Sequence, residues 1–335
     1  MNGYIDYTIK LTLKSPIVTS FQSDTLFGHI CWAINYLKWD DERRVEDFLA
    51  IYDQGKLPLL ISNGFPKDYL PKPIVRPILQ EELRSIFGEK NRKKNSYKIK
   101  AIKKAELIPK YDLLQIIKGW ISPGILFQKL SENFEREEKN RSKKKKEVVY
   151  HNTINRITNR VTTGLYEQEE VFYSENFNEF EIYLKTNYFD KDDLKRIFKF
   201  ISIGGFGKDK STGKGRFDFS IIEGTDLEGS DNPNGFMTLS SYIPHSGAPT
   251  KGYYEILLKY GKLGGNFAGG SAEVNNNPFK KPLIMFRAGS TFYDQGYNKS
   301  KIYGSLLPDV HKNPKIRHYG YAFPLGINME EENDE

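Results

Sequence analysis

The sequence has very little of what stabilises secreted and membrane proteins. Its 335 residues include one cysteine, Cys31, which excludes a disulfide scaffold within the chain and a zinc site built from several cysteines. No segment approaches the roughly 20 consecutive apolar residues of a membrane-spanning helix. The first seven residues have neither the basic nor the apolar region of a secretory signal. We therefore expect a cytoplasmic protein that has no membrane partner.

Aromatic residues are plentiful, and the length allows two domains. The chain has 21 Tyr and 22 Phe, enough large side chains to build a hydrophobic core. At 335 residues it is long for one ordinary domain and short for three. Six aromatic residues near the ends of expected strands and helices suggest an exposed apolar patch that binds protein partners: Trp32, Tyr36, Trp39, Phe292, Tyr293 and Tyr297.

The positive charge is concentrated in one part of the chain. Residues 84–160 contain 21 Lys and Arg against 8 Asp and Glu, whereas the rest of the chain is slightly acidic. Lysine runs are commonly just solvated surface. A basic segment in an otherwise acidic protein is also typical of binding to a polyanion, and we favour a nucleic acid.

The order of expected elements predicts an α+β protein of tandem ferredoxin-like (RRM-like) domains. Alternating apolar residues at 4–13 indicate a strand, and Ser23 or Asp24 is placed to cap a helix that ends near Leu37. A short strand at 57–61 should end in a turn at Asn63-Gly64. After an insertion, strands are expected at 165–173, 180–188 and 216–222, with a helix at 190–203.

The predicted domains follow from this order. The N-terminal domain covers 1–223, with a long, irregular basic insertion at about 72–162 and a glycine-rich loop at 203–216. Strand signals at 237–243, 253–260, 283–292 and 316–323 predict a degenerate second ferredoxin-like domain over 236–329. An acidic tail, 330–335, follows.

The glycine-rich loop is the sharpest candidate site. Lys214 is followed by Gly215 rather than by Ser or Thr, so the loop is not a P-loop, and Lys210 stands where a dinucleotide fingerprint needs glycine. The loop follows a helix, so the helix dipole does not favour a phosphate there. An anion would be held by backbone N–H groups and cations, which suits an RNA backbone. We expect RNA contacts and no cofactor or metal; the candidate residues are Gly204, Gly205, Gly207, Lys208, Lys210, Ser211, Gly213, Lys214, Gly215 and Arg216.

A second polar segment, 155–166, mixes Arg, Asn and Thr. These residue types contact phosphate and ribose in protein–RNA complexes. A polar loop that leads into a hairpin explains the composition equally well. The candidate RNA-binding residues are Asn155, Arg156, Arg160 and Thr162.

Several motifs in series resemble the RAMP superfamily of CRISPR proteins. The motifs are Ser23-Asp24-Thr25-Leu26-Phe27-Gly28-His29-Ile30, the stretch 61–73, the segment 155–166, the glycine-rich loop, and 317–323 near the C-terminus. Within the superfamily the chain is most similar to the fourth subunits of Csm (type III-A) effectors. The resemblance implies a non-catalytic subunit that caps the CRISPR RNA 5′ handle. Its implied partners are the large polymerase-like subunit and a neighbouring RAMP backbone subunit. Ser23 is included among the expected RNA-binding residues.

A catalytic function remains the alternative. Some RAMP proteins are metal-independent endoribonucleases that use a histidine, and His29 is the leading candidate here, with His151 the other. His29 lies at the edge of an apolar helix stripe, which favours a packed histidine. His311 and His318 have no metal-ligand spacing with a third residue. A basic RNA chaperone outside CRISPR systems is a third, weaker hypothesis.

Overall fold

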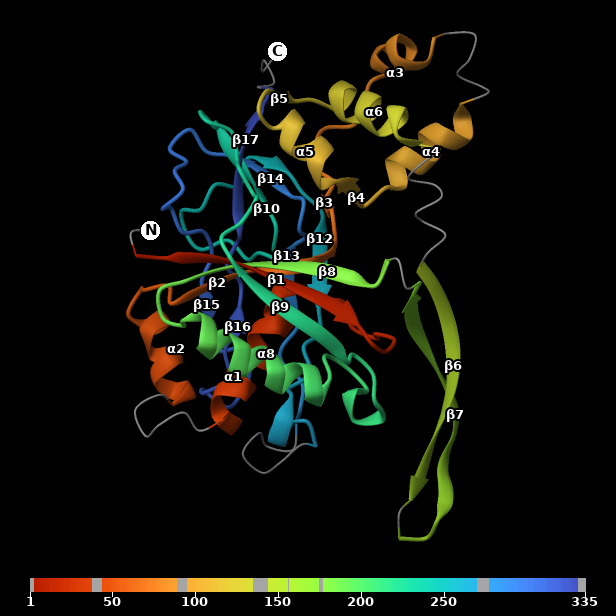
Figure 1. Ribbon diagram of the computed structural model, residues 1–335, viewed down its shortest axis with the longest axis vertical. Coiled ribbons are helices and arrows are strands. Elements are labelled where there is room, and N and C mark those ends of the chain that lie inside the picture. The colour runs from red at the N-terminus through yellow and green to blue at the C-terminus, as the bar shows by residue number, and fades with distance from the viewer. Residues whose placement is uncertain are drawn as a thin grey trace.

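The computed structural model describes residues 3–37, 44–88, 95–134, 144–155, 157–174, 177–269 and 277–330 (Figure 1). Side chains at 144, 153, 162 and 163 are not described. Several features singled out in the sequence therefore lie outside the described residues: Trp39, the basic run 90–94, Arg156, the Thr162 side chain and residues 331–335 of the acidic tail.

A four-stranded antiparallel sheet organises the N-terminal half. Its order is β2–β8–β1–β9, so the last strand of the half pairs with the first. The alternation expected along β1 is present, since Tyr7, Ile9 and Leu11 are each at most 1% exposed. The strands are β1 (Ile5–Leu13), β2 (Leu59–Pro66), β8 (Glu179–Thr186) and β9 (Phe217–Glu223).

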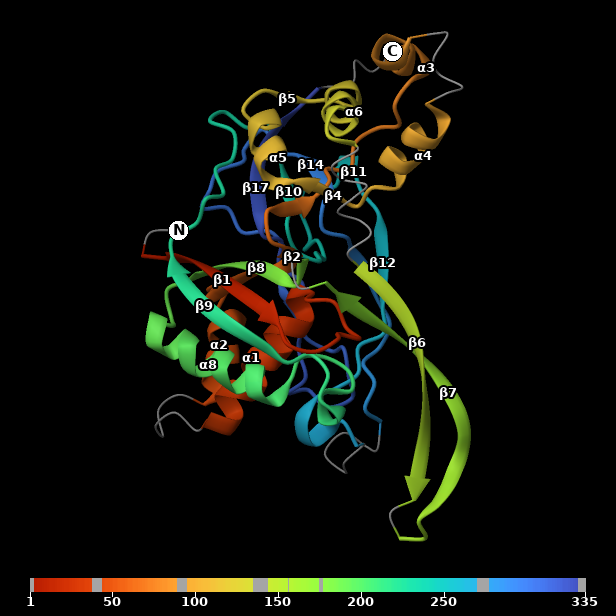
Figure 2. The same ribbon diagram turned by 45° about the vertical axis from the view of Figure 1, so that its right-hand side comes forward.

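Three helices cover one face of this sheet, as Figures 1 and 2 show. They are α1 (Ser23–Leu37), α2 (Val45–Asp53) and α8 (Lys191–Gly204). The α8 helix begins where predicted because the Asp190 carboxylate accepts the N–H groups of Asp192 and Asp193. Leu26, Ile30 and Ala33, which share one face of α1, are buried as expected. Asp24, however, forms an ion pair with Lys259 at 2.9 Å instead of capping α1.

The expected turn at Asn63-Gly64 is instead an irregularity inside β2. The pairing register with β8 shifts between Ile61 and Gly64, and the strand continues to Pro66. Gly64 donates its N–H to the Phe21 carbonyl, and a Cβ there would lie 2.7 Å from the Phe21 Cβ. The dipeptide therefore permits close contact with the loop that precedes α1, a role that local turn statistics do not reveal.

The C-terminal half is built from strands. A five-stranded sheet has the order β11–β14–β10–β17–β5, in which the short β5 comes from the insertion. The described residues 236–269 and 277–330 contain no α-helix. The helices of a second ferredoxin-like unit are thus not seen there. The strands are β10 (Gly235–Thr238), β11 (Gly252–Tyr253), β12 (Ile256–Lys259), β13 (Leu283–Phe286), β14 (Thr291–Tyr293), β15 (Leu306–Leu307), β16 (His318–Tyr319) and β17 (Pro324–Met329).

The two halves share one core. Met237, Leu239 and Ile327 of the C-terminal half belong to the same buried cluster as the first sheet. Tyr319 stacks on Phe27 of α1, with ring centroids 4.8 Å apart. The first sheet is therefore covered on both sides, by helices and by the C-terminal half.

The insertion is folded, so the expectation of a long irregular segment is wrong. Its short helices are amphipathic: Leu83, Phe87, Ile99 and Ile102 are buried while charged side chains face solvent. The lysine-rich composition concealed this short periodicity. The elements are β3 (Tyr69–Pro71), α3 (Gln80–Phe87), α4 (Ser96–Lys104), β4 (Leu107–Pro109), α5 (Lys110–Ile116), β5 (Trp120–Ile121), α6 (Pro123–Glu132), β6 (Lys144–Asn155) and β7 (Arg160–Tyr173).

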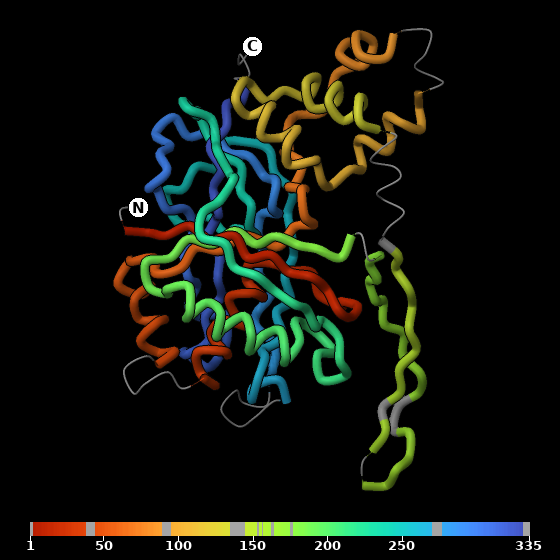
Figure 3. The backbone as a smooth tube through the Cα atoms, in the orientation of Figure 1, coloured from red at the N-terminus to blue at the C-terminus, as the bar shows by residue number. Residues whose placement is uncertain are grey.

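The last part of the insertion is a long hairpin. Strands β6 and β7 pair with each other and extend away from the body, as the tube in Figure 3 shows. The strand expected at 165–173 is therefore present but belongs to this hairpin, not to the first sheet. Within the described part of the chain, no helix is long and apolar enough to cross a membrane.

Candidate RNA interface

The glycine-rich loop connects α8 to β9 and is held firmly against the body. It contains a single turn of 3₁₀ helix, Lys210–Thr212. The Phe206 N–H donates to the Gly215 carbonyl, and the Gly215 N–H donates to the Pro16 carbonyl, both at 2.9 Å. These bonds close the base of the loop onto the segment that follows β1.

Three of its glycines are explained by close packing. Gly205, Gly207 and Gly215 have φ values of 79°, 79° and 69°, which favour glycine. A Cβ on Gly215 would lie 2.1 Å from the Phe206 carbonyl oxygen, and one on Gly207 would lie 2.6 Å from the Thr19 Cβ. These glycines let backbone segments approach each other, so they are not by themselves evidence of phosphate binding.

The backbone amides of the loop are largely engaged within the protein. Gly207 donates to His29 Nε2 and Lys208 donates to Thr19 Oγ1, each at 3.0 Å. Arg216 donates to Ser15 Oγ at 2.9 Å. The expectation that backbone N–H groups hold an anion is therefore wrong for these amides. Side chains must provide any RNA contact here.

Two of the four cations in the loop are bound by the β6–β7 hairpin. Lys214 Nζ lies 2.6 Å from Glu170 Oε2, and the Glu170 side chain is 0% exposed. Lys208 Nζ hydrogen-bonds to Gln168 Oε1. Next to these contacts, Ile17 and Val171 form an isolated antiparallel bridge. The base of the hairpin is therefore fixed to the glycine-rich loop.

Lys210 and Arg216 are the loop cations that remain available. Both are exposed, and neither forms an ion pair with a residue that the structure describes. Ser211 is also exposed. These side chains form the accessible polar surface of the loop, which Lys208 extends because it is exposed despite its contact with Gln168.

The second candidate segment forms the tip of the hairpin. Asn155 ends β6 and pairs with Arg160, the first residue of β7. The Asn155 side chain accepts the N–H groups of Ile157 at 2.9 Å and Thr158 at 3.1 Å, which shapes the turn. Figure 3 shows that the tip lies at the far end of the hairpin from the body. The structure therefore brings the glycine-rich loop to the base of the hairpin, not to its tip.

The comparisons with known proteins agree with this architecture. A model of the RAMP superfamily matches residues 20–218, which is more than half of the chain. The chain belongs to the RAMP superfamily. No curated protein matches its sequence.

Solved structures of two Csm assemblies have a similar fold over nearly the whole chain. One match is in a Csm1–Csm4 cassette in complex with cA4, with a TM-score of 0.55, 18% identity, and coverage of 98% of this chain and 99% of that chain. Another is in a Csm3–Csm4 subcomplex of the type III-A CRISPR-Cas interference complex, with a TM-score of 0.55, 18% identity, and coverage of 97% and 99%. Csm4 is the subunit common to both assemblies.

His29 supports the loop of this RAMP protein and is poorly placed for catalysis. Its Nε2 accepts the Gly207 N–H, and its ring packs on Phe206 with centroids 4.7 Å apart. Burial, and then the charge of Lys210, lowers the His29 pKa to about 3. An imidazole with its lone pair bound to a backbone amide and such a low pKa is a poor general base at neutral pH.

His318 is buried, and His151 lies beside a buried carboxylate. Burial lowers the pKa of His318 to about 3, with a further contribution from the charge of Lys280. His151 Nε2 lies 3.6 Å from the Glu170 carboxylate. The described residues contain no cluster of three or more His, Cys, Asp or Glu that could hold a metal ion.

Ser23 is not accessible to RNA. It is 0% exposed, and its N–H donates to Asn63 Oδ1 at 2.8 Å. Its expected RNA contact is not retained. Sequence reasoning also missed Gln168 and Glu170, the hairpin residues that bind the loop cations. The acidic run 167–170, beside a basic segment, was the available signal.

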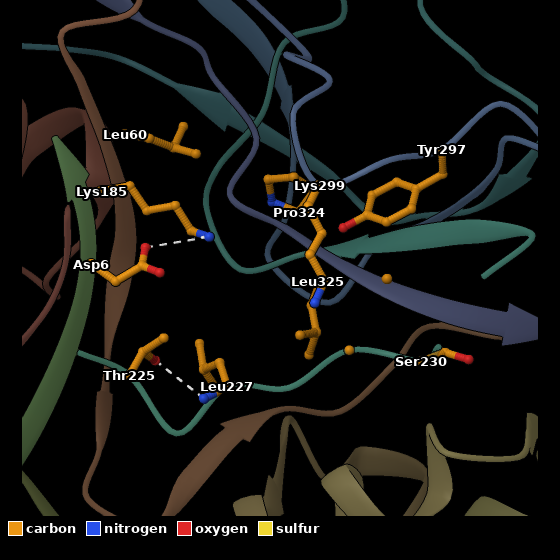
Figure 4. Close-up of a pocket in the computed structure, with 12 residues that line it drawn as sticks. Asp6, Leu60, Lys185, Thr225, Leu227, Ser230, Tyr297, Lys299, Pro324 and Leu325 are labelled. Atoms are coloured by element: carbon orange, nitrogen blue, oxygen red, sulfur yellow. Dashed lines mark hydrogen bonds and ion pairs between the residues drawn. The ribbon is translucent and has the colours of Figure 1, made fainter. Parts of the chain in front are cut away.

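A cavity of about 130 Å³ lies between the first sheet and β17 (Figure 4). Asp6 and Lys185, paired neighbours on β1 and β8, lie on the same side of it, with 3.3 Å between their charged atoms. No residue of the glycine-rich loop or the hairpin lines it. The cavity is therefore separate from the candidate RNA interface.

Proposed function

We propose that this RAMP protein is a cytoplasmic, non-catalytic RNA-binding subunit of a type III-A CRISPR (Csm) effector complex. It caps the 5′ handle of the guide RNA and bridges the large polymerase-like subunit to the RAMP backbone subunits. The match of nearly the whole chain to two Csm4-containing assemblies carries the proposal. One of those assemblies pairs Csm4 with Csm1 and the other pairs it with Csm3, which supports two protein partners.

The RNA-binding part of the proposal is assigned to two surfaces. The first is the exposed side of the glycine-rich loop, with Lys208, Lys210, Ser211 and Arg216. The second is the hairpin tip with Asn155 and Arg160, to which Arg156 and Thr162 belong in sequence. We also propose that the chain divides functionally near 224–235 into an RNA-binding part, 1–223, and a C-terminal part, 236–329.

Salt-dependent binding tests the loop surface. Replacing Lys210 and Arg216 by Ala removes two exposed cations, which should flatten the slope of log affinity against log salt by roughly 1.4 for single-stranded RNA. The matched control replaces Lys56 and Lys195, which are exposed elsewhere, with the same loss of charge. An unchanged slope in the Lys210/Arg216 variant would remove the loop from the interface.

Sequence preference tests the proposed cap. RNA carrying the repeat-derived 5′ handle should bind more tightly than RNA with a scrambled handle at physiological salt, because selective RNA recognition reads unstacked bases. Equal affinities for the two RNAs would contradict handle recognition and leave only general RNA binding.

The non-catalytic proposal and the endoribonuclease alternative predict opposite results in one assay. Under the proposal, purified protein incubated with repeat RNA in the absence of metal leaves the RNA intact. Cleavage that is lost in His29→Ala but retained in His151→Ala would overturn the non-catalytic assignment. The folded state of each variant should be checked by its thermal unfolding midpoint, because His29 also supports the glycine-rich loop.

A further inference from the structure

The aromatic residues expected to form an exposed patch include Phe292 and Tyr297, and both pack within the C-terminal half. Phe292 is 0% exposed, and Tyr297 packs on Phe236 with ring centroids 6.2 Å apart. An aromatic residue that sequence reasoning did not single out, Tyr97 of α4, is 66% exposed and lies among lysines. The surroundings of Tyr97 are therefore of interest as a binding surface.

The outward face of α4 combines this tyrosine with cations. The two isoleucines of the helix are buried, and α4 packs against α6. Because an α-helix turns by about 100° per residue, Tyr97, Lys100 and Lys104 share the opposite face. Lys100, Lys103 and Lys104 are all exposed, and α4 contains no acidic residue. This face is therefore purely basic, with one aromatic ring among the lysines.

The lysines at the end of α4 are not needed to stabilise the helix. Cations near a helix C-terminus commonly interact with the helix dipole and the last carbonyl groups. Lys72 does this for α4, because its Nζ donates to the carbonyls of Ile102 and Lys103 at 3.1 and 3.2 Å. Lys100, Lys103 and Lys104 form no ion pair with any residue that the structure describes. Their charges are thus available to an external anion.

The lysine run at the start of β6 behaves differently. Lys145 Nζ lies 2.5 Å from a Glu147 carboxylate oxygen, and Lys146 Nζ lies 2.7 Å from one of Glu169. These two lysines are compensated within the hairpin. The composition of the insertion therefore does not show which of its lysines can bind a polyanion, whereas the structure favours those of α4.

The α4 helix lies on the side of the body from which the hairpin projects, as Figures 1 and 2 both show. Two residues after α4, Glu106 is held 3.2 Å from Arg287 of the C-terminal half. The hydrogen bond to Glu169 raises the pKa of Lys146 in β6, and the charge of Glu106 raises it further, so the end of α4 lies near the hairpin. An RNA strand that crosses the glycine-rich loop and the hairpin base can reach α4 on the same side.

We propose that the outward face of α4 is a further contact for the guide RNA, which it binds as a single strand. The three lysines contact backbone phosphates, and the exposed Tyr97 ring provides a surface on which a base stacks. A protein partner fits this face poorly, because lysine is depleted in the cores of protein interfaces. The proposal rests on the proposed function only in taking the guide RNA as the bound strand.

Salt dependence tests the lysines. Replacing Lys100, Lys103 and Lys104 by Gln should flatten the slope of log affinity against log salt by roughly 2 for single-stranded guide RNA. The matched control variant loses the same charge from three exposed lysines elsewhere: Lys56, Lys281 and Lys312. An unchanged slope in the α4 variant, or an equal change in the control variant, would overturn the proposal.

Stacking is tested independently of charge. Tyr97→Ala should weaken guide-RNA binding roughly fivefold or more with an unchanged salt slope, whereas Tyr97→Phe should bind as the wild-type protein does. The thermal unfolding midpoint checks the fold of both variants, because the Tyr97 ring packs on Phe134 with centroids 6.3 Å apart. In the wild-type protein, guide RNA that contains 4-thiouridine should crosslink within residues 95–104. Absence of this crosslink would contradict the contact whatever the variants do.

The failure of this contact and the failure of the proposed function can be told apart, because the Lys210/Arg216 variant is measured alongside. If the handle preference and the effect of the loop variant are present but the α4 variants bind as the wild-type protein does, the α4 contact is wrong and the proposed function stands. If the wild-type chain binds neither handle RNA nor scrambled RNA, both fail. Protection of α4 amides from exchange by a co-expressed subunit, without protection by guide RNA, would assign the face to protein and overturn the proposal.

Discussion

The glycine-rich loop and the hairpin tip carry similar polar residues but are held in different ways. In the loop, backbone amides donate to His29, Thr19 and the Pro16 carbonyl, so its shape depends on α1 and on the segment that precedes it. At the tip, the side-chain hydrogen bonds are local, because the Asn155 carboxamide accepts the N–H groups of Ile157 and Thr158. The loop is a fixed platform with exposed side chains, whereas the tip is shaped by its own turn.

The difference shows how a glycine-rich sequence can mislead. Glycines next to lysines suggest a backbone cradle for phosphate. Here Gly215 is required because the Phe206 carbonyl occupies the space of a side chain. The glycines therefore provide the shape of the loop, and its exposed cations whose charged groups have no hydrogen-bond or ion-pair partner among the described residues are Lys210 and Arg216.

The largest expected effect tests the fixed shape of the loop. Gly215→Ala should cost at least about 3 kcal/mol of unfolding free energy, because it combines a positive φ with a Cβ 2.1 Å from a carbonyl oxygen. Gly213→Ala is the control, with φ 88° and nothing within 4 Å, and should cost about 1 kcal/mol. Chemical denaturation measures both, and equal losses would mean that the close approach is unimportant.

The next effect concerns the contact between loop and hairpin. Lys214→Met should leave the fully buried Glu170 carboxylate without its cation, at a cost of about 3 kcal/mol to the attachment of the hairpin. Residues 166–173 should then exchange amide hydrogens faster, and the hairpin should be cleaved sooner by protease. Adding Glu170→Gln should restore much of the attachment. No change in exchange in the single variant would show that the ion pair does not hold the hairpin.

Two buried histidines in the body of the protein predict that its stability depends on pH. Burial lowers the pKa values of His29 and His318 from their ordinary 6.5 to about 3. Below pH 6.5 the unfolded chain binds these protons and the folded chain does not, so stability falls as pH falls toward 3. Each histidine contributes up to about 1.4 kcal/mol per pH unit.

His29→Gln separates the two histidines. The Gln amide oxygen can still accept the Gly207 N–H but does not titrate, so the acid slope of unfolding free energy should be shallower by about 1.4 kcal/mol per pH unit. Parallel slopes for the wild-type protein and the variant would contradict the buried, neutral state of His29.

The smallest effect is expected at the tip. Asn155→Ala removes two hydrogen bonds from an exposed turn and should lower global stability by less than about 1 kcal/mol. Exchange at residues 157–160 should rise while the thermal midpoint hardly moves. A large global loss would show that the tip is coupled to the body.

The sequence predicted the elements whose periodicity is strong and whose ends are marked locally. The α1 helix occupies Ser23–Leu37 as expected, and Asp190 caps α8. It did not predict α3, because this helix buries only Leu83 and Phe87 among glutamates and an arginine. It also missed β17, a largely buried strand whose apolar pattern is interrupted by Gly326.

For the candidate site, the sequence by itself determined which residues gather in the glycine-rich loop, which helix the loop follows, and that positive charge is concentrated in the insertion. Only the tertiary structure decided which of these residues are available. Lys214 is bound by Glu170, 44 residues earlier in the chain, and His29 is bound by Gly207, 178 residues later. Composition and periodicity report local preferences, whereas such pairings depend on how distant segments pack, so no local pattern could distinguish Lys214 from Lys210.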